Sequence, residues 1–412
     1  MRILILPAYF TPEKMASSHL DDNRYQAFSD NKIRMLCYTP QPTRGINKET
    51  YMKYSTIKYE VLYNHMMEVH RFCLMKESEN TVQRALRYML CAVKQFIKGI
   101  SSKNVDAIYV VSTPPIQGAM GALIKKFKKV PLIYNLQDIF PDSLVGTGLA
   151  SKNGFLWKIG RVIEDFTYRN ADKIIVISED FKRNIMAKGV PEEKIEVIYN
   201  WVDEKVVVNI NRENNVLFDR YNLDPDKFYI TYCGNIGLTQ NMNLLLEVAQ
   251  ELSSINDIHF VVVGEGAYKK DVERLIDDKQ IRNVTLLPFQ PYEEISHVFS
   301  LGNIGLIISK PGVGENSVPS KTWSILSAER AVIANFDENE LKSIIETNHC
   351  GIFTKAGDKD AFKNAILTLY NNKEDTIKMG RNGRQFILQS LTREIGTSKY
   401  VDVIKSFKKT NL

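Results

Sequence analysis

One lysine of the sequence stands where a positive charge is unfavourable. The segment VPSKTWSILSAERAVIA, residues 318 to 334, places a proline, a serine and a lysine at the start of a predicted short helix. The first turn of a helix has unpaired N–H donors and the positive end of the dipole, so a cation there needs water or an anion. Pro319 fixes the entry, the Ser320 hydroxyl is expected to cap the helix, and a bound diphosphate would contact both Ser320 and Lys321. We favour this phosphate site over a lysine that is only solvated.

Two glycine-containing turns could approach the same ligand. CGNIGLTQ has Gly234 and Gly237 between a strand and a helix, and VVVGEG has Gly264 and Gly266 after the next strand. Small residues in such turns let backbone N–H groups reach an anion. A tight strand-to-helix turn explains each pair of glycines equally well.

A further loop, KPGVGENSVPSK, precedes the predicted helix and contains Glu315 and Asn316. Both side chains could hydrogen-bond sugar hydroxyls. The alternative, an ordinary surface loop, has equal weight.

Carboxylates and hydroxyls also follow strands in the first half of the chain. The loop PAYFTPEKMASSHL carries Glu13, Ser17, Ser18 and His19, and NLQDIFPDS carries Asp138 and Asp142. A carboxylate beyond a strand end can position a hydroxyl nucleophile or balance positive charge that develops at a reacting carbon. Asp138 is the better catalytic candidate, whereas Asp142 is expected to cap a turn and a lone histidine is more often structural or solvated.

Strands that alternate with helix-length segments must position these loops. The expected strands are residues 2–6, 33–38, 106–111, 131–136, 173–178 and 194–199, and then 228–234, 258–264, 284–289, 304–309 and 331–334. Continuous apolar runs with helices between them are typical of parallel sheets covered on both faces. The pattern therefore predicts two doubly wound α/β domains, with a ligand beyond the carboxyl ends of the strands in a cleft between them.

Length and composition agree with this organisation. The chain has 412 residues, enough for two domains, with 44% hydrophobic and 25% charged residues. No run is long enough for a signal-peptide core or a spanning helix, so we expect a cytoplasmic location. The five cysteines are odd in number, lack metal-ligand spacing and are interpreted as buried thiols.

The positive charge of the chain is concentrated in its first half. Residues 1–200 hold 29 Lys and Arg against 20 Asp and Glu, and residues 80–137 hold nine basic residues and a single acid, Asp106. Such a surface suits an anionic partner, a membrane or a phosphorylated lipid, more than nucleic acid, because no nucleic-acid signature is present.

An amphipathic helix is predicted within this basic region, over residues 81–103. Its apolar face is expected to pack on the sheet. Its basic residues, with the lysines of residues 125–129, could instead hold the domain against anionic lipid.

Taken together, these segments resemble the retaining glycosyltransferases of family 4, and more closely the branch that builds bacterial surface polysaccharides, including fucosamine transferases. The resemblance runs nearly end to end and rests on YFTPE, PTRG (42–45), DIFPDS (138–143), KIIVIS, KIEVIYNWVD, GNIG, VGEG and VPSK. It implies a GT-B fold with an acceptor-binding domain (1–200), a donor-binding domain (201–390) and a terminal helix (391–412) that packs back on the first domain.

The resemblance also implies an activity and a set of site residues. The activity is transfer of a hexose derivative, expected to be an N-acetylated or deoxy hexosamine, from a UDP-sugar to a polyprenyl-diphosphate-linked saccharide in capsule or O-antigen synthesis. No metal or cofactor is required, and the enzyme is expected at the inner face of the cell membrane. Catalytic residues would be Asp138, Lys321 and Glu13; acceptor-binding residues would be Ser17, Ser18 and His19; donor-binding residues would be Gly234, Asn235, Gly237, Gly264, Phe289, Glu315, Asn316, Ser320, Lys321 and Ser324.

The chain departs from the family pattern at several of these positions. Gln240 occupies a position where a lysine is common, and Ser324 occupies the second glutamate of the E-x7-E pattern. A glycine usual before the following strand is replaced by Glu329.

Two other functions remain open from the sequence alone. A sugar-nucleotide epimerase can share this architecture, although the chain offers few residues for proton transfer. A non-catalytic subunit that holds a partner transferase at the membrane would tolerate the loss of Asp138, whereas an enzyme would not.

Overall fold

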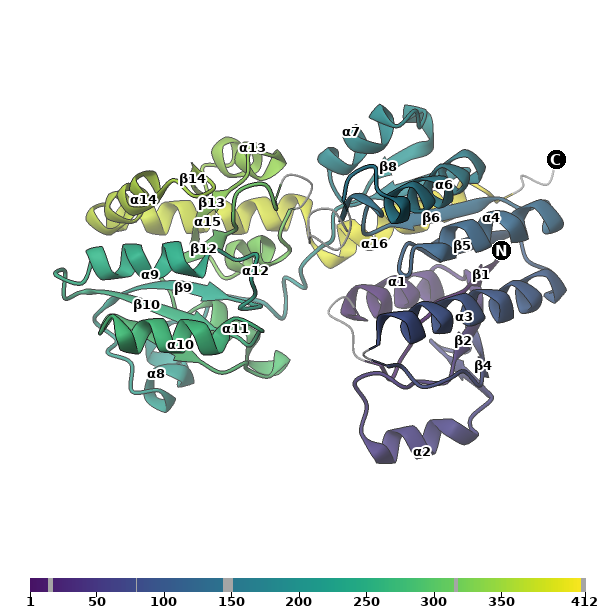
Figure 1. Cartoon of the computed structure of the whole chain (residues 1–412), viewed down its shortest axis with the longest axis horizontal. Coiled ribbons are helices and arrows are strands. Elements are labelled where there is room, and N and C mark those ends of the chain that lie inside the picture. The colour runs from purple at the N-terminus through teal and green to yellow at the C-terminus, as the bar shows by residue number, and fades with distance from the viewer. Residues whose placement is uncertain (14–17, 79, 144–150, 315–317, 409–412) are drawn as a thin grey trace. The chain divides into compact units, whose positions relative to one another are not determined.

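The computed structural model describes residues 1–13, 18–78, 80–143, 151–314 and 318–408 (Figure 1). The chain divides into two compact units. Unit 1 comprises Met1–Tyr199 with Gly396–Leu412, and unit 2 comprises Asn200–Ile395. Each unit is built on its own largely parallel sheet, so the predicted α/β class with two doubly wound halves is confirmed.

Unit 1 is built on an eight-stranded sheet in the order β3-β4-β2-β1-β5-β6-β7-β8. Its elements are β1 (Arg2–Ile5), α1 (Ser18–Asp30), β2 (Arg34–Pro40), α2 (Lys48–Thr56), β3 (Tyr59–Leu62), β4 (Met67–Phe72), α3 (Thr81–Ser101), β5 (Ala107–Val111), α4 (Ile116–Lys128), β6 (Leu132–Leu136), α6 (Phe155–Asn170), β7 (Lys173–Val176), α7 (Glu179–Ala187), η1 (Glu192–Lys194), β8 (Ile195–Val197) and α16 (Arg393–Lys405).

The central strands of unit 1 are the apolar runs seen in the sequence. β1, β5 and β6 are almost wholly buried, and their side chains join those of α4 and α6 in one core. Burial on both faces is what a parallel sheet between two helix layers requires.

One edge of this sheet was not expected from the sequence. β3 pairs antiparallel with β4, and the side chains of β3 are exposed or only partly buried. The expectation of a purely parallel sheet is therefore wrong at this edge. A half-exposed edge strand does not have the continuous apolar run by which the other strands were recognised.

Unit 2 is built on a six-stranded parallel sheet in the order β11-β10-β9-β12-β13-β14. Its elements are η2 (Arg212–Asn214), α8 (Val216–Arg220), β9 (Phe228–Cys233), α9 (Met242–Glu251), β10 (Ile258–Val263), α10 (Lys269–Asp278), β11 (Val284–Leu287), η3 (Tyr292–Glu294), α11 (Ile295–Phe299), β12 (Ile304–Ile308), α12 (Lys321–Ser327), β13 (Ala331–Phe336), α13 (Glu340–Thr347), β14 (Gly351–Lys355), α14 (Lys359–Asn371) and α15 (Lys373–Ser390).

Each sheet has one point where the direction of winding reverses. In unit 1 the neighbours β1 and β5 are the pair from which the chain proceeds to opposite edges, and in unit 2 the neighbours are β9 and β12. The loops that leave two such strands diverge and open a crevice at their carboxyl ends. A ligand site is therefore expected after β1 and β5, and another after β9 and β12.

The chain returns to unit 1 within α16. Tyr400 on this helix is fully buried, its hydroxyl donates to Asn135 Oδ1 at 3.1 Å, and the Arg24 guanidinium lies 5.1 Å from the centre of its ring. The described residues from Gly396 onward thus belong to unit 1.

The structure corrects the expectation that all five cysteines are buried. Cys37, Cys91, Cys233 and Cys350 are buried, but Cys73 is exposed. Cys73 directly follows β4, near the same edge of the sheet that the sequence did not reveal.

The predicted amphipathic helix exists as α3, but most of its apolar stripe does not pack on the sheet as expected, while Lys94 and Lys98 are exposed as well. Leu86, Val93 and Ile97 are exposed, whereas Arg87 and Gln95 are fully buried. The buried polar groups have partners: Arg87 Nε donates to Met75 O at 3.2 Å, and Gln95 Nε2 donates to two backbone carbonyls. Backbone carbonyls thus accept from both buried side chains, although Arg87 Nη1 has no partner among the described residues, and the apolar stripe of the helix faces outward.

Candidate functional site

Lys321 lies at the switch point of unit 2, in contact with the loop that leaves β9. Its Nζ donates to the Tyr232 hydroxyl at 2.9 Å and lies 4.2 Å from the centre of the Tyr232 ring. A Cβ atom placed on Gly234 would lie 3.2 Å from this Nζ. Lys321 and Gly234, which the sequence assigned to one phosphate site, are therefore neighbours.

The environment of the Lys321 ammonium is unusually poor in negative charge. Burial lowers the pKa of Lys321 to about 8, and within the described ranges no carboxylate pairs with it. A desolvated cation without a counter-ion favours binding of an anion, because the anion restores the interaction lost with water.

The two glycine-containing loops of unit 2 pack directly on each other. Gly264 has φ +153°, and a Cβ there would lie 1.9 Å from the carbonyl oxygen of Gly234; a Cβ on Gly266 would lie 2.2 Å from Ile236 O. Only glycine permits so close a backbone approach. The tight-turn explanation therefore applies to Gly264 and Gly266, because these glycines let their loop pack against the β9–α9 loop beside Lys321.

Three backbone donors of the β9–α9 loop already have partners within the protein. Gly234 N donates to Val263 O at 2.9 Å, Ile236 N donates to Glu265 O at 2.8 Å, and Gly237 N donates to Gln240 Oε1 at 3.1 Å. The expectation that this loop offers a row of free amides to a phosphate is therefore wrong for these residues. Gln240, which replaces a lysine of the family pattern, closes the turn instead.

Ser320 does not cap α12 as the sequence predicted. Its backbone is already helical, with φ −58° and ψ −24°, and its hydroxyl makes no capping hydrogen bond. A capping residue needs an extended backbone so that its side chain can reach back to the second or third amide. The exposed Ser320 hydroxyl therefore stays available next to Lys321, while Ser324 lies one turn further along α12.

The remaining predicted donor residues lie on other loops of unit 2. Asn235 is exposed on the β9–α9 loop, and Phe289 is exposed just beyond β11. Glu315 and Asn316 lie outside the described residues, as does Ser17 of the first half.

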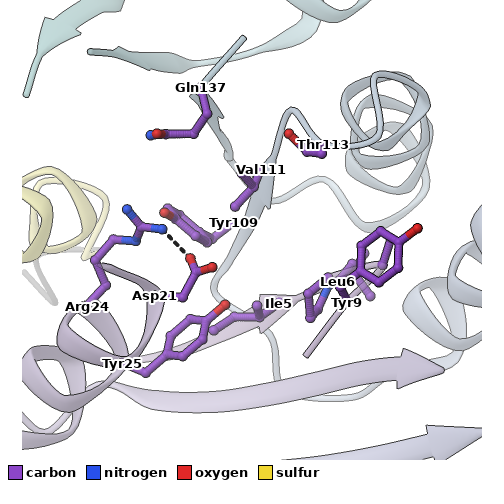
Figure 2. A pocket seen from close by; sticks show the side chains of 12 residues that line it. Ile5, Leu6, Tyr9, Asp21, Arg24, Tyr25, Tyr109, Val111, Thr113 and Gln137 are labelled. Carbon is purple, nitrogen blue, oxygen red and sulfur yellow. Dashed lines mark hydrogen bonds and ion pairs between the residues drawn. The ribbon is translucent and has the colours of Figure 1, made fainter. Parts of the chain in front are cut away.

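A pocket opens at the switch point of unit 1 (Figure 2). It is lined by Ile5, Leu6, Pro7, Ala8, Tyr9, Asp21, Arg24, Tyr25, Tyr109, Val111, Thr113 and Gln137. These residues come from the ends of β1 and β5, from α1 and from the residue after β6. Figure 2 shows the carboxylate of Asp21 joined to the guanidinium of Arg24 beside the Tyr109 ring.

The sequence analysis did not identify this pocket. Asp21 and Arg24 are three residues apart in α1 and look like a surface ion pair, but the Arg24 side chain is almost completely buried. The only sequence signal was an arginine on the same helical stripe as the apolar Leu20 and Phe28.

Glu13 is placed to hold a loop. Its Oε1 accepts from Thr43 N at 2.7 Å and Arg44 N at 2.9 Å, and its Oε2 accepts from Phe10 N at 3.2 Å. Burial nevertheless raises the pKa of Glu13. With both oxygens engaged, Glu13 joins the TPE and PTRG segments, and its catalytic role stays a prediction without geometric support.

Asp138 and Asp142 follow β6 but have different surroundings. Asp138 is exposed, and its Oδ2 accepts from the Ser143 hydroxyl at 3.1 Å. Asp142 pairs with Lys188 at 2.7 Å, and Lys188 also pairs with the buried Glu164. Asp142 thus belongs to a structural ion-pair cluster, while Asp138 is outside that cluster and directly follows Gln137 of the pocket.

The two described acceptor candidates begin α1. Ser18 is partly exposed and donates to Glu13 O at 3.5 Å, and it lines a second hollow with Tyr9 and Asp22. His19 is the next residue of the helix and is also partly exposed. Both lie near the pocket of Figure 2, because Tyr9, Asp21 and Tyr25 line the two hollows together.

Two α/β units with a site at each switch point define the GT-B class of fold. Residues 213–386 match the family described as glycosyl transferases group 1, and residues 68–206 match Glycosyltransferase Family 4. The chain is therefore a glycosyltransferase of the GT-B fold.

Proteins of similar sequence are also named as glycosyltransferases. WcaI of Escherichia coli K12, named as a colanic acid biosynthesis glycosyl transferase, is 26% identical over 65% of this chain and 67% of its own. The probable glycosyltransferase WbjE of Pseudomonas aeruginosa is 22% identical over 74% of both chains.

Solved structures share the fold at lower identity. Anabaena HepE in complex with UDP superposes with a TM-score of 0.73 at 15% identity, over 98% of this chain and all of its own. WaaG, a glycosyltransferase involved in lipopolysaccharide biosynthesis, superposes with a TM-score of 0.68 at 13% identity, over 98% of this chain and 99% of its own.

Proposed function

We propose that this chain transfers a sugar from a UDP-sugar to a lipid-linked saccharide, with retention of the anomeric configuration, during synthesis of a bacterial surface polysaccharide. The observation that carries the donor half is the partly buried Lys321 ammonium, which has Tyr232 as its hydrogen-bond partner and lies beside Gly234. A nucleoside diphosphate supplies the negative charge that this site lacks. The UDP complex of HepE, which has the same fold, supports the choice of nucleotide.

In this proposal Lys321 acts on the leaving group. When the bond between the sugar and the diphosphate breaks, negative charge accumulates on the departing phosphate oxygen. A preorganised ammonium stabilises that charge more than it stabilises the intact donor. The Ser320 hydroxyl can donate a further hydrogen bond to the same diphosphate, and no residue of the proposed set requires a metal ion.

The acceptor is proposed to bind in the unit 1 pocket. Thr113 carries a hydroxyl group and Gln137 an amide, which are group types that hydrogen-bond sugars. Asp138, next to Gln137, would orient the attacking hydroxyl. The names of WcaI and WaaG support a cell-surface saccharide, and the resemblance to fucosamine transferases supports an N-acetylated or deoxy hexosamine as the transferred sugar.

Calorimetric titration of UDP into the wild-type protein and Lys321→Met tests the donor site. The variant should bind UDP tens of fold more weakly, because a charge-assisted contact of about 2 kcal/mol is lost. Lys269→Met is the matched control: Lys269 follows the neighbouring β10 but its ammonium already pairs with Glu265 at 2.6 Å. Unchanged UDP affinity in Lys321→Met would remove Lys321 from the site.

The Asp138→Asn variant separates a transferase from the other functions. It should bind UDP normally but lose transfer to a lipid-linked acceptor. An epimerase would convert a UDP-sugar without any acceptor, and a binding subunit would keep pathway output in Asp138→Asn.

A further inference from the structure

The outer side of α3 is an apolar stripe that none of the described residues of unit 1 covers. Val82, Leu86, Met89, Val93 and Ile97 follow each other at intervals of three or four residues and are all about half exposed or more. This spacing places them on one side of the helix. A continuous apolar stripe of this length on a surface helix marks an interaction site.

The neighbouring helices extend the stripe into a surface. α3 packs beside α4, and α4 packs beside α6 (Figure 1). α4 exposes Leu123 and Phe127, and α6 exposes Phe155, Leu156, Ile159 and Val162. We refer to the exposed side of these helices as the α3–α4–α6 face.

Close packing holds the three helices as one layer. Phe96 of α3 meets Phe127 of α4 edge to face at 5.7 Å between ring centres. A Cβ on Gly99 would lie 2.6 Å from Ile124, so glycine is needed where α3 and α4 approach. Lys126 of α4 lies 4.9 Å from the ring centre of Phe166 on α6.

The charge of the face is mostly of one sign. α3 and α4 contain no acidic residue, and the two acids of α6, Glu164 and Asp165, both pair with Arg161. The exposed lysines on or next to the three helices are Lys94, Lys98, Lys103, Lys126, Lys129, Lys152 and Lys158; against them stands the exposed Asp106, whose carboxylate accepts from Arg2 N at 2.7 Å, so the charge of the face is predominantly positive. Apolar side chains with lysines around them match the boundary between acyl chains and anionic headgroups.

We propose that the α3–α4–α6 face docks on an anionic lipid bilayer, with its apolar side chains inserted below the headgroups and its lysines level with the phosphates. A second copy of the chain fits the face less well. A twofold contact would place this basic surface against itself, and like charges would repel. Within the described residues no helix is long and apolar enough to cross a membrane, so the docking is peripheral.

The inner side of α3 connects this face to the pocket of Figure 2. The Tyr88 hydroxyl lies 2.9 Å from the Tyr9 hydroxyl, and the Arg87 guanidinium lies 5.2 Å from the centre of the Tyr9 ring. Tyr9 lines the pocket. Docking therefore places the pocket within one helix diameter of the bilayer surface. The saccharide of a lipid-linked acceptor would lie at the same height. That an acceptor binds there rests on the proposed function, whereas the docking itself does not.

Tryptophan fluorescence provides a direct measure of docking. Trp157 on α6 is partly exposed, whereas Trp201 and Trp323 are buried. Vesicles of phosphatidylglycerol and phosphatidylcholine should shift the emission of the full-length protein to the blue, and Trp157→Phe should abolish the shift. Pure phosphatidylcholine vesicles should bind at least tenfold more weakly.

Two sets of variants separate the apolar and the charged contributions in a vesicle co-sedimentation assay. The triple variant Met89→Gln, Val93→Gln and Ile97→Gln should bind vesicles at least tenfold more weakly than the wild type. The double variant Lys98→Gln and Lys158→Gln should weaken vesicle binding by about fivefold for each lysine removed. The control is Ile377→Gln with Leu388→Gln, an equally exposed apolar pair on α15 of unit 2. These side chains are exposed, so all variants should keep the wild-type melting temperature.

Three outcomes would overturn the proposal. They are absence of wild-type binding, equal loss of binding in the α15 control, and a lipid-free dimer that the α3 variant dissociates. UDP titration needs no lipid, so the donor site can fail or succeed independently of docking.

Discussion

The Lys321 ammonium is desolvated before any ligand arrives. Its hydrogen bond to the Tyr232 hydroxyl and its position over the ring hold it beside Gly234, but they do not replace a full counter-charge. Burial lowers the pKa to about 8. A diphosphate that binds there should raise the pKa again, because a nearby anion favours the charged form.

This linkage predicts how UDP affinity depends on pH. Below pH 8 the ammonium is charged and binds UDP fully; above pH 8 the free protein loses the proton that binding requires. The dissociation constant for UDP should therefore rise about tenfold between pH 7 and pH 9, where UDP itself is already ionised. Calorimetry across this range measures the effect.

Two comparisons check that Lys321 is the titrating group. Lys321→Met should bind weakly with little dependence on pH. In the wild type, calorimetry at pH 8 in buffers of different ionisation enthalpy should detect proton uptake, and a flat wild-type profile with no uptake would show that another group binds the diphosphate.

Single residues differed in how well the sequence revealed them. Lys321 was identifiable because a cation in the first turn of a helix is locally unfavourable, so its position required an explanation. Asp21 and Arg24 were not, because their spacing is the same in a surface pair and in a buried one. The burial of Arg24 depends on Tyr109 and Tyr400, which come from distant parts of the chain.

Among the helices and strands, those that are buried on both faces were the ones that the sequence predicted best. The central strands are buried on both faces, so β1, β5, β9 and β12 appear as short apolar runs. β3 is an edge strand and gives no such run. For α3 the periodicity predicted the helix correctly. The same periodicity is found whether the apolar stripe packs against the protein core or against a membrane, so it could not predict which way the stripe faces.

The turn between α12 and β13 yields a prediction about stability. Glu329 has φ +58°, a left-handed conformation that suits glycine, and the family pattern has glycine there. Glu329→Gly should raise the free energy of unfolding by about 0.5–1 kcal/mol, since a side chain is disfavoured in this conformation. Thermal or urea unfolding monitored by circular dichroism measures the change.

Glu329→Ala is the control for this turn. It removes the carboxylate, which accepts a weak hydrogen bond from Asn209 at 3.3 Å, but it keeps a Cβ in the left-handed conformation. If Glu329→Ala stabilised the protein as much as Glu329→Gly, backbone strain would not be the cause. The gain in unfolding free energy would then come from removal of the carboxylate charge.

At the scale of the whole molecule, the two units use the chain differently. Unit 2 is one continuous segment, Asn200–Ile395, whereas unit 1 is completed by Gly396–Leu412. Tyr400 fills the unit 1 core against Asn135 and Arg24. We therefore expect the last part of the chain to be needed for unit 1 and not for unit 2.

A stop codon after Ile395 should expose this difference. Unit 1 should lose 3 kcal/mol or more of stability, because truncation removes a fully buried tyrosine and its hydrogen bond. Unit 2 should keep its UDP site, so in scanning calorimetry UDP should still raise the transition of unit 2. A chain ending at Lys408 is the control and should melt like the wild type. Loss of UDP binding in the chain that ends at Ile395 would show that unit 2 needs the last part of the chain for its UDP site.

Cys73 gives the protein a natural attachment point for a probe. Burial raises the pKa of Cys91, Cys233 and Cys350 to about 12 and also raises that of Cys37, so these four thiols are shielded and protonated at neutral pH. Cys73 is exposed, and its carbonyl oxygen accepts from Lys94 of α3 at 2.7 Å. A maleimide dye should therefore label the unmutated protein once, next to α3, and energy transfer to a lipid dye would then measure how far this helix lies from a membrane.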